Sequence, residues 1–332
     1  MLALPAERGQ MNPRILLVGG YGVVGSRVAA QLRRHHPDLR LVIAGRNQGK
    51  AKDLAGRLGN AEAAVIDTAD ADPLAQVHGD IAAVLALVHD HDDNLLRAAI
   101  ARGLPYVDIT RGVAAQTRAY VTASLAPIRA PVMFASNWMA GVPAILALHL
   151  ARDLAPIDSV TLSILYDMSE TIGPDSADAG STMSEPFMAR VDGAWRKVEG
   201  LSDPLVVSFP SGRERPTVRV SMADVVTLAQ ATRARDVAVR IGIEPARENP
   251  GPVSHEIVVE VASPKGKRRL ALLDPHGQAH LTATGVVANL ERVLGLSGAA
   301  LQPGTCVPET AADGARLIDL LRAEGVALTG DI

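Results

Sequence analysis

Short apolar runs alternate with polar or helical stretches along residues 14–135. The first run, Arg14–Val18, is apolar after its first residue, as expected of a strand that is buried on both faces. Ser26–Arg34 follows it with apolar residues at helical spacing. Similar runs recur at 39–44, 63–66, 81–88, 106–109 and 132–135. Because each gap is long enough for a crossover, the pattern predicts a doubly wound parallel sheet of the α/β class over residues 12–142.

The periodicity changes after Pro156, where apolar and polar residues begin to alternate. The alternation covers 160–164, 237–243 and 257–261, and it indicates strands with one face exposed to water. A helix rich in Ala and Leu is expected to begin near Pro143. These features predict an inserted, mainly antiparallel α+β domain over residues 143–281. Helices are expected at 286–294 and 311–321, the second opened by Thr310-x-x-Asp313, which is similar to a capping box.

Composition and charge restrict the class of protein. The 332 residues are 48% apolar, and 33 basic against 36 acidic side chains give a net charge of −3. This balance argues against disorder and against a nucleic-acid partner. The longest apolar run, Ile81–Val88, is shorter than the roughly 20 residues of a membrane span. The single cysteine, Cys306, leaves no disulfide or cysteine-cluster metal site and fits a cytoplasmic protein. Residues 1–12 lack signal-peptide character and are expected to form a terminal tail.

A glycine-rich turn stands between the first predicted strand and its helix. It reads Gly19-Gly20-Tyr21-Gly22-Val23-Val24-Gly25. Glycines at this spacing permit a tight turn and let a pyrophosphate approach the backbone N–H groups at a helix N-terminus. The alternative is a purely structural turn. The strand before it and the helix after it favour dinucleotide binding, with contacts from Gly19, Tyr21, Gly22, Val23, Val24 and Gly25.

The second predicted strand ends in Ala44-Gly45-Arg46, where an NAD-binding domain usually has an acidic residue for the ribose hydroxyls. An arginine there can bind a 2′-phosphate, with Lys50 as a second cation, so the sequence favours NADP(H) over NAD(H). A solvated arginine is the alternative. Asp67 follows the third strand and either accepts a hydrogen bond from the adenine amino group or caps the next helix.

Candidate catalytic residues follow the fourth and fifth strands. The fourth run ends in His89-Asp90-His91-Asp92-Asp93, at the sheet edge where ligands bind in such folds. An imidazole beside a carboxylate can transfer protons near neutral pH, so His89 and His91 are candidates. A metal site would need a third ligand that the sequence does not supply, and a polar capping loop is the structural alternative. Tyr106 and Asp108 are expected at the same edge. No tyrosine has a lysine four residues later, which argues against short-chain dehydrogenases.

Several motifs together resemble the saccharopine dehydrogenase-like oxidoreductases from Arg14 onward. They include the glycine-rich turn with Ala44-Gly45-Arg46, the Tyr106-Val107-Asp108 strand, and the turn with Asn137, Gly141 and Pro143. A further one is the late turn Pro303-Gly304-Thr305-Cys306-Val307-Pro308-Glu309. The resemblance implies a Rossmann NADP-binding domain and an inserted substrate and dimerisation domain. It also implies a C-terminal segment, 282–332, that returns to the Rossmann domain.

The same resemblance implies the activity: hydride transfer between NADP(H) and a C=N or C=C bond of a small metabolite. The alternative is a noncatalytic NADP(H)-binding regulator. The implied assembly is a homodimer, with no nucleic-acid or membrane partner. Where saccharopine reductases carry Asn-Glu-x-Gly-x-Asp-Pro-Gly, this chain has Trp138 and Val142 at the two acidic positions. An amino-acid ammonium would lose its partners there, so a less polar substrate is expected.

Overall fold

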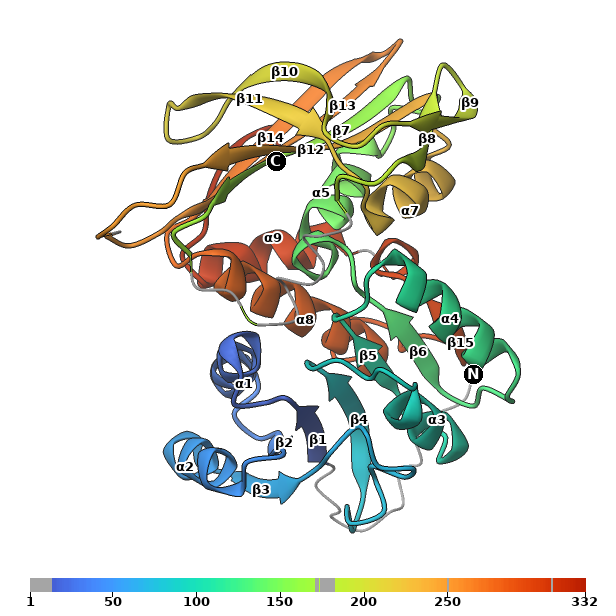
Figure 1. Cartoon of the computed structure of the whole chain (residues 1–332), viewed down its shortest axis with the longest axis vertical. Helices are drawn as coiled ribbons and strands as arrows, with labels where there is room; N and C mark the ends of the chain where they lie inside the picture. The colour runs from blue at the N-terminus through green and yellow to red at the C-terminus, as the bar shows by residue number, and fades with distance from the viewer. Residues whose placement is uncertain (1–13, 171–172, 174–182, 250, 312) are drawn as a thin grey trace.

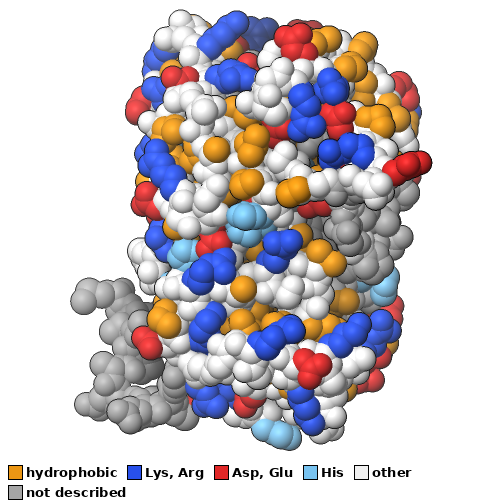
Figure 2. Space-filling view, turned by 90° about the vertical axis from the view of Figure 1, so that its left-hand side faces the viewer, with side chains coloured by type: hydrophobic (Ala, Val, Ile, Leu, Met, Phe, Trp, Pro, Cys, Tyr) orange, Lys and Arg blue, Asp and Glu red, His pale blue; other side chains and the backbone are white. Residues whose placement is uncertain are grey.

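The computed structural model describes residues 14–170, 173, 183–249, 251–311 and 313–332. Two sheets lie at opposite ends of the molecule, with helices α5, α8 and α9 between them (Figure 1). The predicted terminal tail at 1–12 lies outside the described residues. Within the described ranges no helix is long and apolar enough to cross a membrane. Basic and acidic side chains are interspersed on the face shown in Figure 2.

The N-terminal sheet confirms the predicted parallel α/β fold. In the part of the chain that the structure describes it has seven strands, in the order β15-β6-β5-β4-β1-β2-β3, all paired in parallel. The strands are β1 (Arg14–Val18), β2 (Arg40–Gly45), β3 (Ala61–Val65), β4 (Ile81–Ala86), β5 (Tyr106–Asp108), β6 (Pro131–Phe134) and β15 (Gly304–Cys306). Its helices are α1 (Val23–His35), α2 (Gln48–Leu58), α3 (Asn94–Ala101) and α4 (Val113–Ser124). From β1 the strand order runs to β2 and β3 on one side and to β4, β5 and β6 on the other, and such a switch point opens a crevice at the carboxyl ends of β1 and β4.

The second sheet is mixed. Its described strands follow the order β10-β11-β12-β7-β13-β14-β16. Among these described strands, only β7 and β12 pair in parallel. The strands are β7 (Ser159–Asp167), β10 (Ser202–Ser208), β11 (Glu214–Arg219), β12 (Asp236–Glu244), β13 (His255–Ser263), β14 (Gly266–Asp274) and β16 (Ala327–Gly330). A separate hairpin consists of β8 (Phe187–Val191) and β9 (Ala194–Val198), and α7 (Ala223–Thr232) packs beside it. The mainly antiparallel domain was therefore predicted correctly, except for the parallel pair.

The elements between the two sheets form one continuous core with both of them. They are η1 (Trp138–Gly141), α5 (Val142–Ala151), α8 (Gln278–Leu294), η2 (Pro308–Thr310) and α9 (Gly314–Ala323). Helix α8 packs on α1, η1 and α9. It begins at Gln278, before the predicted start at Val286, and the backbone N–H of Gln278 donates to the Glu170 carboxylate at 2.6 Å.

One expectation for the C-terminal segment was wrong, and another holds for only part of the segment. Helix α9 is capped by Asp313, which accepts from the Arg316 backbone N–H at 3.0 Å, whereas the Thr310 hydroxyl closes the short η2 turn. The segment also does not return to the N-terminal sheet alone. Strand β15 extends that sheet beside β6, but β16 pairs with β14 of the second sheet. The last 30 or so residues therefore connect the two ends of the molecule.

Candidate functional site

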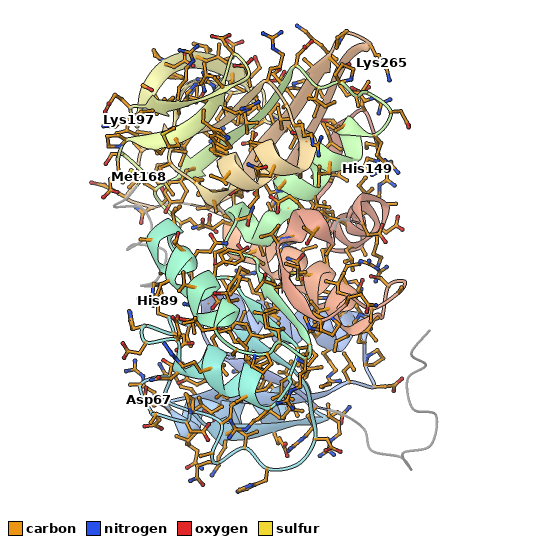
Figure 3. All side chains as sticks on the ribbon, turned by 90° about the vertical axis from the view of Figure 1, so that its right-hand side faces the viewer. Asp67, His89, His149, Met168, Lys197 and Lys265 are labelled. Carbon is orange, nitrogen blue, oxygen red and sulfur yellow. The ribbon has the colours of Figure 1, made fainter. Side chains whose placement is uncertain are left out.

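A cavity of about 890 Å³ lies at the carboxyl edge of the N-terminal sheet and extends to the second sheet. It is within the range of small-molecule sites, ~300–1,000 Å³. Figure 3 shows residues of both parts along one side of the molecule: Asp67 and His89 below, and Met168 above them. Residues from β1, β2, β4, β7, β12 and α8 or the loops after them contribute to its lining. The cavity is thus built by both sheets.

The glycine-rich turn leaves the N-terminus of α1 open toward the cavity. Gly22 is the N-cap, so no side chain caps the helix, and the first turn of α1 has no acidic residue. A Cβ on Gly25 would lie 2.2 Å from the Gly19 carbonyl oxygen, so glycine is needed for this close approach. Gly22, Val23 and Val24 line the cavity. Free N–H groups and the helix dipole at this end favour an anion such as a phosphate.

The end of β2 lies beside this turn. The Tyr21 hydroxyl accepts a hydrogen bond from the backbone N–H of Asn47 at 2.8 Å and holds the turn against the strand end. Arg46 is exposed and lines the cavity. Lys50 lies on α2, is exposed, and is absent from the described lining. Of the two predicted cations, Arg46 therefore lines the cavity, whereas Lys50 lies outside the described lining.

Asp67 also lines the cavity. Its carboxylate accepts from the backbone N–H of Ala69 at 3.1 Å, so it closes a turn; the structure assigns no helix to 68–72. The neighbouring Thr68 hydroxyl donates to the carbonyl of His89 at 3.0 Å. This bond joins the loop after β3 to the loop after β4, so that Asp67 and His89 border the same space.

The loop after β4 divides its polar side chains between the cavity and the interior. His89, His91 and Asp92 line the cavity, and the two imidazole rings lie 5.1 Å apart between centroids. Asp90 and Asp93 point into a buried network instead. In the described part of the chain no group of three or more His, Cys, Asp or Glu is placed to hold a metal ion.

Tyr106 and Asp108 do not reach the cavity, contrary to the predicted catalytic role. Both are fully buried, and the Tyr106 hydroxyl donates to Asp108 Oδ2 at 2.9 Å. Asp108 Oδ2 also accepts from Arg111 Nε at 2.6 Å. The short β5 strand turns both side chains inward, where a carboxylate needs hydrogen-bond partners. The pair supports the loop that follows β5 and does not contact a ligand in the cavity.

Arg111 is the centre of this buried network, and the sequence analysis missed it. Besides Asp108, its guanidinium contacts Asp93 and lies 3.4 Å from Asp90. Burial alone would lower the pKa of Arg111, but Asp108 and Tyr106 more than offset this and raise it. Burial raises the pKa of Asp90 and that of Tyr106. Arg111 lines the cavity, yet three carboxylates already surround its charge.

The turn after β6 carries a fixed aromatic side chain into the cavity. Met139, Ala140 and Gly141 all have positive φ angles of 48°, 52° and 86°, which turn the chain sharply after Trp138. The Trp138 indole N–H donates to His255 Nε2 at 3.1 Å, and the two rings stack at 22°. Burial lowers the pKa of His255 to about 4, so the imidazole is neutral and can accept this bond. The sequence analysis noted Trp138 only because it stands where saccharopine reductases carry an acidic residue.

Buried acids lie beneath this turn. Asp224 Oδ2 accepts from the Trp138 backbone N–H at 2.9 Å, and Glu309 Oε1 accepts from the Asn137 amide at 2.8 Å. Thr227 also donates to Glu309. Burial, reinforced by the neighbouring Asp224 charge, raises the pKa of Glu309 to about 7. Burial raises the pKa of Asp224 to about 6.

The comparisons with known proteins fit this geometry. Residues 15–130 match the model of the saccharopine dehydrogenase NADP binding domain. The fold is similar to that of saccharopine dehydrogenase (L-Glu forming) from Saccharomyces cerevisiae, with a TM-score of 0.66 and 13% identity, over 96% of this chain and 100% of that one. A search of curated proteins finds no match.

Two further solved structures have lower TM-scores. Amine dehydrogenase from Mycobacterium smegmatis has a TM-score of 0.48 and 16% identity, over 91% of this chain and 96% of that one. Dihydrodipicolinate reductase from Paenisporosarcina sp. TG-14 has a TM-score of 0.47 and 12% identity, over 90% of this chain and 99% of that one. The structural likeness concerns the fold, while the sequence match covers the glycine-rich turn and the end of β2. Residues 15–130 therefore form a nucleotide-binding domain of the saccharopine dehydrogenase-like family.

Proposed function

We propose that this protein is an NADP(H)-dependent oxidoreductase that transfers a hydride to a C=N or C=C bond of a small metabolite. One observation carries the proposal: a single cavity begins at an uncapped helix N-terminus beside Arg46 and continues into the second domain. The first half has the groups that a dinucleotide needs. The second half offers space for a molecule beside it, which favours an enzyme over a noncatalytic regulator.

The residues present fit the cofactor. The backbone N–H groups of Val23 and Val24 would hold the pyrophosphate at the start of α1, where a side-chain cap or acidic residue would have blocked it, while the N–H of Gly22 donates to the Gly19 carbonyl at 2.9 Å. The Arg46 guanidinium would bind the 2′-phosphate in a bidentate manner. Asp67 would accept a hydrogen bond from the adenine amino group. Lys50 would add only a long-range attraction, because it does not line the cavity.

Bound NADPH would supply the hydride. As the substrate carbon gains that hydride, the π electrons of the double bond move to the nitrogen or to the other carbon, which takes up one proton. His89 and His91 border the cavity and are the proton sources we propose. The Thr68 bond to the His89 carbonyl fixes the loop that carries them. Tyr106 and Asp108 are positioning residues that hold Arg111 behind this loop.

Isotope transfer tests the proposal. NADPH that carries deuterium at C4 of the nicotinamide is mixed with the protein and a panel of cyclic imines and conjugated enones, and products are analysed by mass spectrometry. We expect deuterium on one carbon of a reduced product from at least one class. We also expect a loss of rate of about 10²-fold or more in His89→Ala or His91→Ala. NADPH binding without deuterium transfer to any compound would support the regulator instead.

A further inference from the structure

The wall that the second domain gives to the cavity is uncharged. From Ser136 to the C-terminus, no described residue of the lining carries a formal charge. The large apolar or aromatic side chains of this wall are those of Trp138, Met139, Tyr166, Met168, Met183, Met222, Ile241 and Ile243. Polar groups on this wall are few and neutral, such as Gln278 and Thr282 at the start of α8. The charged lining residues all belong to the N-terminal domain.

Arg111, whose backbone N–H donates to the hydroxyl of Ser136 at the edge of this wall at 3.0 Å, is not free to bind a substrate anion. Arg111 is 5% exposed and is paired with Asp90, Asp93 and Asp108. Three carboxylates surround the Arg111 guanidinium, and Arg118 pairs with Asp93 alone among them, so the cluster has no positive charge to spare for a further carboxylate. Burying an unpaired carboxylate against the apolar wall would cost several kcal/mol. A substrate with a carboxylate at this end is therefore disfavoured.

The aromatic part of the wall is held rigidly. Trp138 is fixed by the bond to His255 and by its backbone bond to Asp224, and Tyr166 meets its ring edge-on at 76° with 6.4 Å between centroids. An aromatic surface that is fixed before binding costs little entropy when a flat molecule packs on it. The surrounding methionines, Met168, Met183 and Met222, have flexible side chains that adapt to the outline of such a ligand.

We infer that the substrate of the proposed reductase is uncharged at the end that enters the second domain, and is a flat apolar molecule such as an aromatic or conjugated compound. The uncharged lining and the fixed Trp138 ring carry this inference, which rests on the proposed function. One hydrogen-bonding group on the substrate can meet Gln278 or Thr282. An amino acid does not fit this description.

Calorimetry with matched ligands tests the inference. NADP⁺ is first titrated into the protein, and the saturated complex then receives cinnamamide or cinnamate, and 2-naphthamide or 2-naphthoate. The two members of each pair differ in charge but little in shape. We expect the amide to bind at least about 10-fold more tightly than the carboxylate in one pair or both. Equal affinities, tighter binding of the carboxylates, or no binding of any of the four would overturn the inference.

Two variants sharpen the test. Ile243 lines the cavity and is 45% exposed, so Ile243→Lys places a cation on the wall without burying it fully. We expect this change to shift the preference toward the carboxylates by about 10-fold, and Met222→Lys to act in the same direction. Met188→Lys is the control, because Met188 is 49% exposed on β8 and outside the described lining. An unchanged preference in both wall variants would contradict the inference.

The first titration separates this inference from the proposed function. Heat of NADP⁺ binding with a wrong ligand preference would overturn the substrate class and leave the reductase proposal standing. An absence of NADP⁺ binding would remove the reductase proposal itself.

Discussion

The Arg111 guanidinium is the side chain on which the buried part of the site depends most. Its removal would leave Asp90 and Asp108 without a cationic partner in the interior and Asp93 with only the half-exposed Arg118. We expect Arg111→Met to lower the free energy of unfolding by about 3–5 kcal/mol. Arg111→Lys should recover only part of this, since an ammonium cannot reach three carboxylates with the geometry of a guanidinium.

Urea unfolding at neutral pH measures this effect, and Arg118→Met provides the matched control. Arg118 contacts only Asp93 among these carboxylates, and its side chain is 50% exposed. Its loss should therefore cost no more than about 1 kcal/mol. Similar losses in Arg111→Met and Arg118→Met would show that the network does not depend on the buried guanidinium.

The acid beneath the turn, Glu309, gives a prediction about pH. Burial, reinforced by Asp224, raises its pKa in the folded protein to about 7, above the unfolded value of about 4.3. The folded state therefore binds more protons, and the stability that this carboxyl contributes is present below about pH 4 and is lost as pH rises to 7. The neutral Glu309→Gln side chain has no such loss.

We accordingly expect Glu309→Gln to gain stability relative to the natural chain between pH 5 and pH 8, by roughly 1–3 kcal/mol. Urea unfolding at the two pH values measures the change. The amide keeps the acceptor for Asn137 and Thr227, so the contacts at Oε1 remain. A difference between the two proteins that is the same at both pH values would contradict the raised pKa.

At the scale of elements, α8 and the turn at 138–141 are in such close contact that one glycine of the helix is required. A Cβ on Gly285 would lie 2.4 Å from the Met139 carbonyl oxygen. In α2, by contrast, a Cβ on Gly56 would meet nothing within 4 Å. Alanine is favoured over glycine by about 1 kcal/mol in a helix interior, so the two sites differ only in their surroundings.

The same substitution should therefore have opposite effects. We expect Gly56→Ala to raise the free energy of unfolding by about 0.5–1 kcal/mol and Gly285→Ala to lower it, because the turn must move away from the helix. Thermal unfolding of the two variants beside the natural chain measures this. Stabilisation by both substitutions would mean that the turn does not pack on α8 as described.

Elements with a strong local pattern were predictable from the sequence. Continuous apolar runs predicted β1 to β6, and strict alternation predicted β7, β12 and β13. Strand β15 is only three residues long, Gly304–Cys306, and carries no pattern that distinguishes it from a loop. The β9 strand is exposed along nearly its whole length and shows no apolar face. Their pairing depends on partners that are distant in the sequence.

Only the part of the candidate site that belongs to a local sequence motif was predictable. The glycine-rich turn and Arg46 belong to a local motif, and the structure places both at the cavity. Trp138 and His255 are 117 residues apart, and Arg111 is joined to Asp90 over 21 residues. No local pattern reports such contacts. Tyr106 and Asp108 were assigned to catalysis from their position at a strand end, which does not show which way a side chain turns.

At the scale of the whole molecule, polar contacts and an ion pair join the C-terminal end of α1 to the C-terminal segment. Glu324 accepts from His35 Nε2 at 2.7 Å and also contacts Arg34, and Glu291 lies 2.8 Å from His36 Nε2. Because α1 also packs along α8, these contacts help to fix the N-terminal domain against the helices between the two sheets (Figure 1). The expected homodimer and the cytoplasmic location remain predictions.

Comparison of the two nicotinamide nucleotides by calorimetry tests the central claim most directly. The account predicts that NADPH binds at least about 10-fold more tightly than NADH, because Arg46 pairs with the 2′-phosphate. Arg46→Asp should reverse this preference, whereas Arg57→Asp, on the exposed side of the α2 helix that follows Arg46 and outside the described lining, should leave it unchanged. Equal affinity of the natural chain for both nucleotides, or binding of neither, would contradict the account.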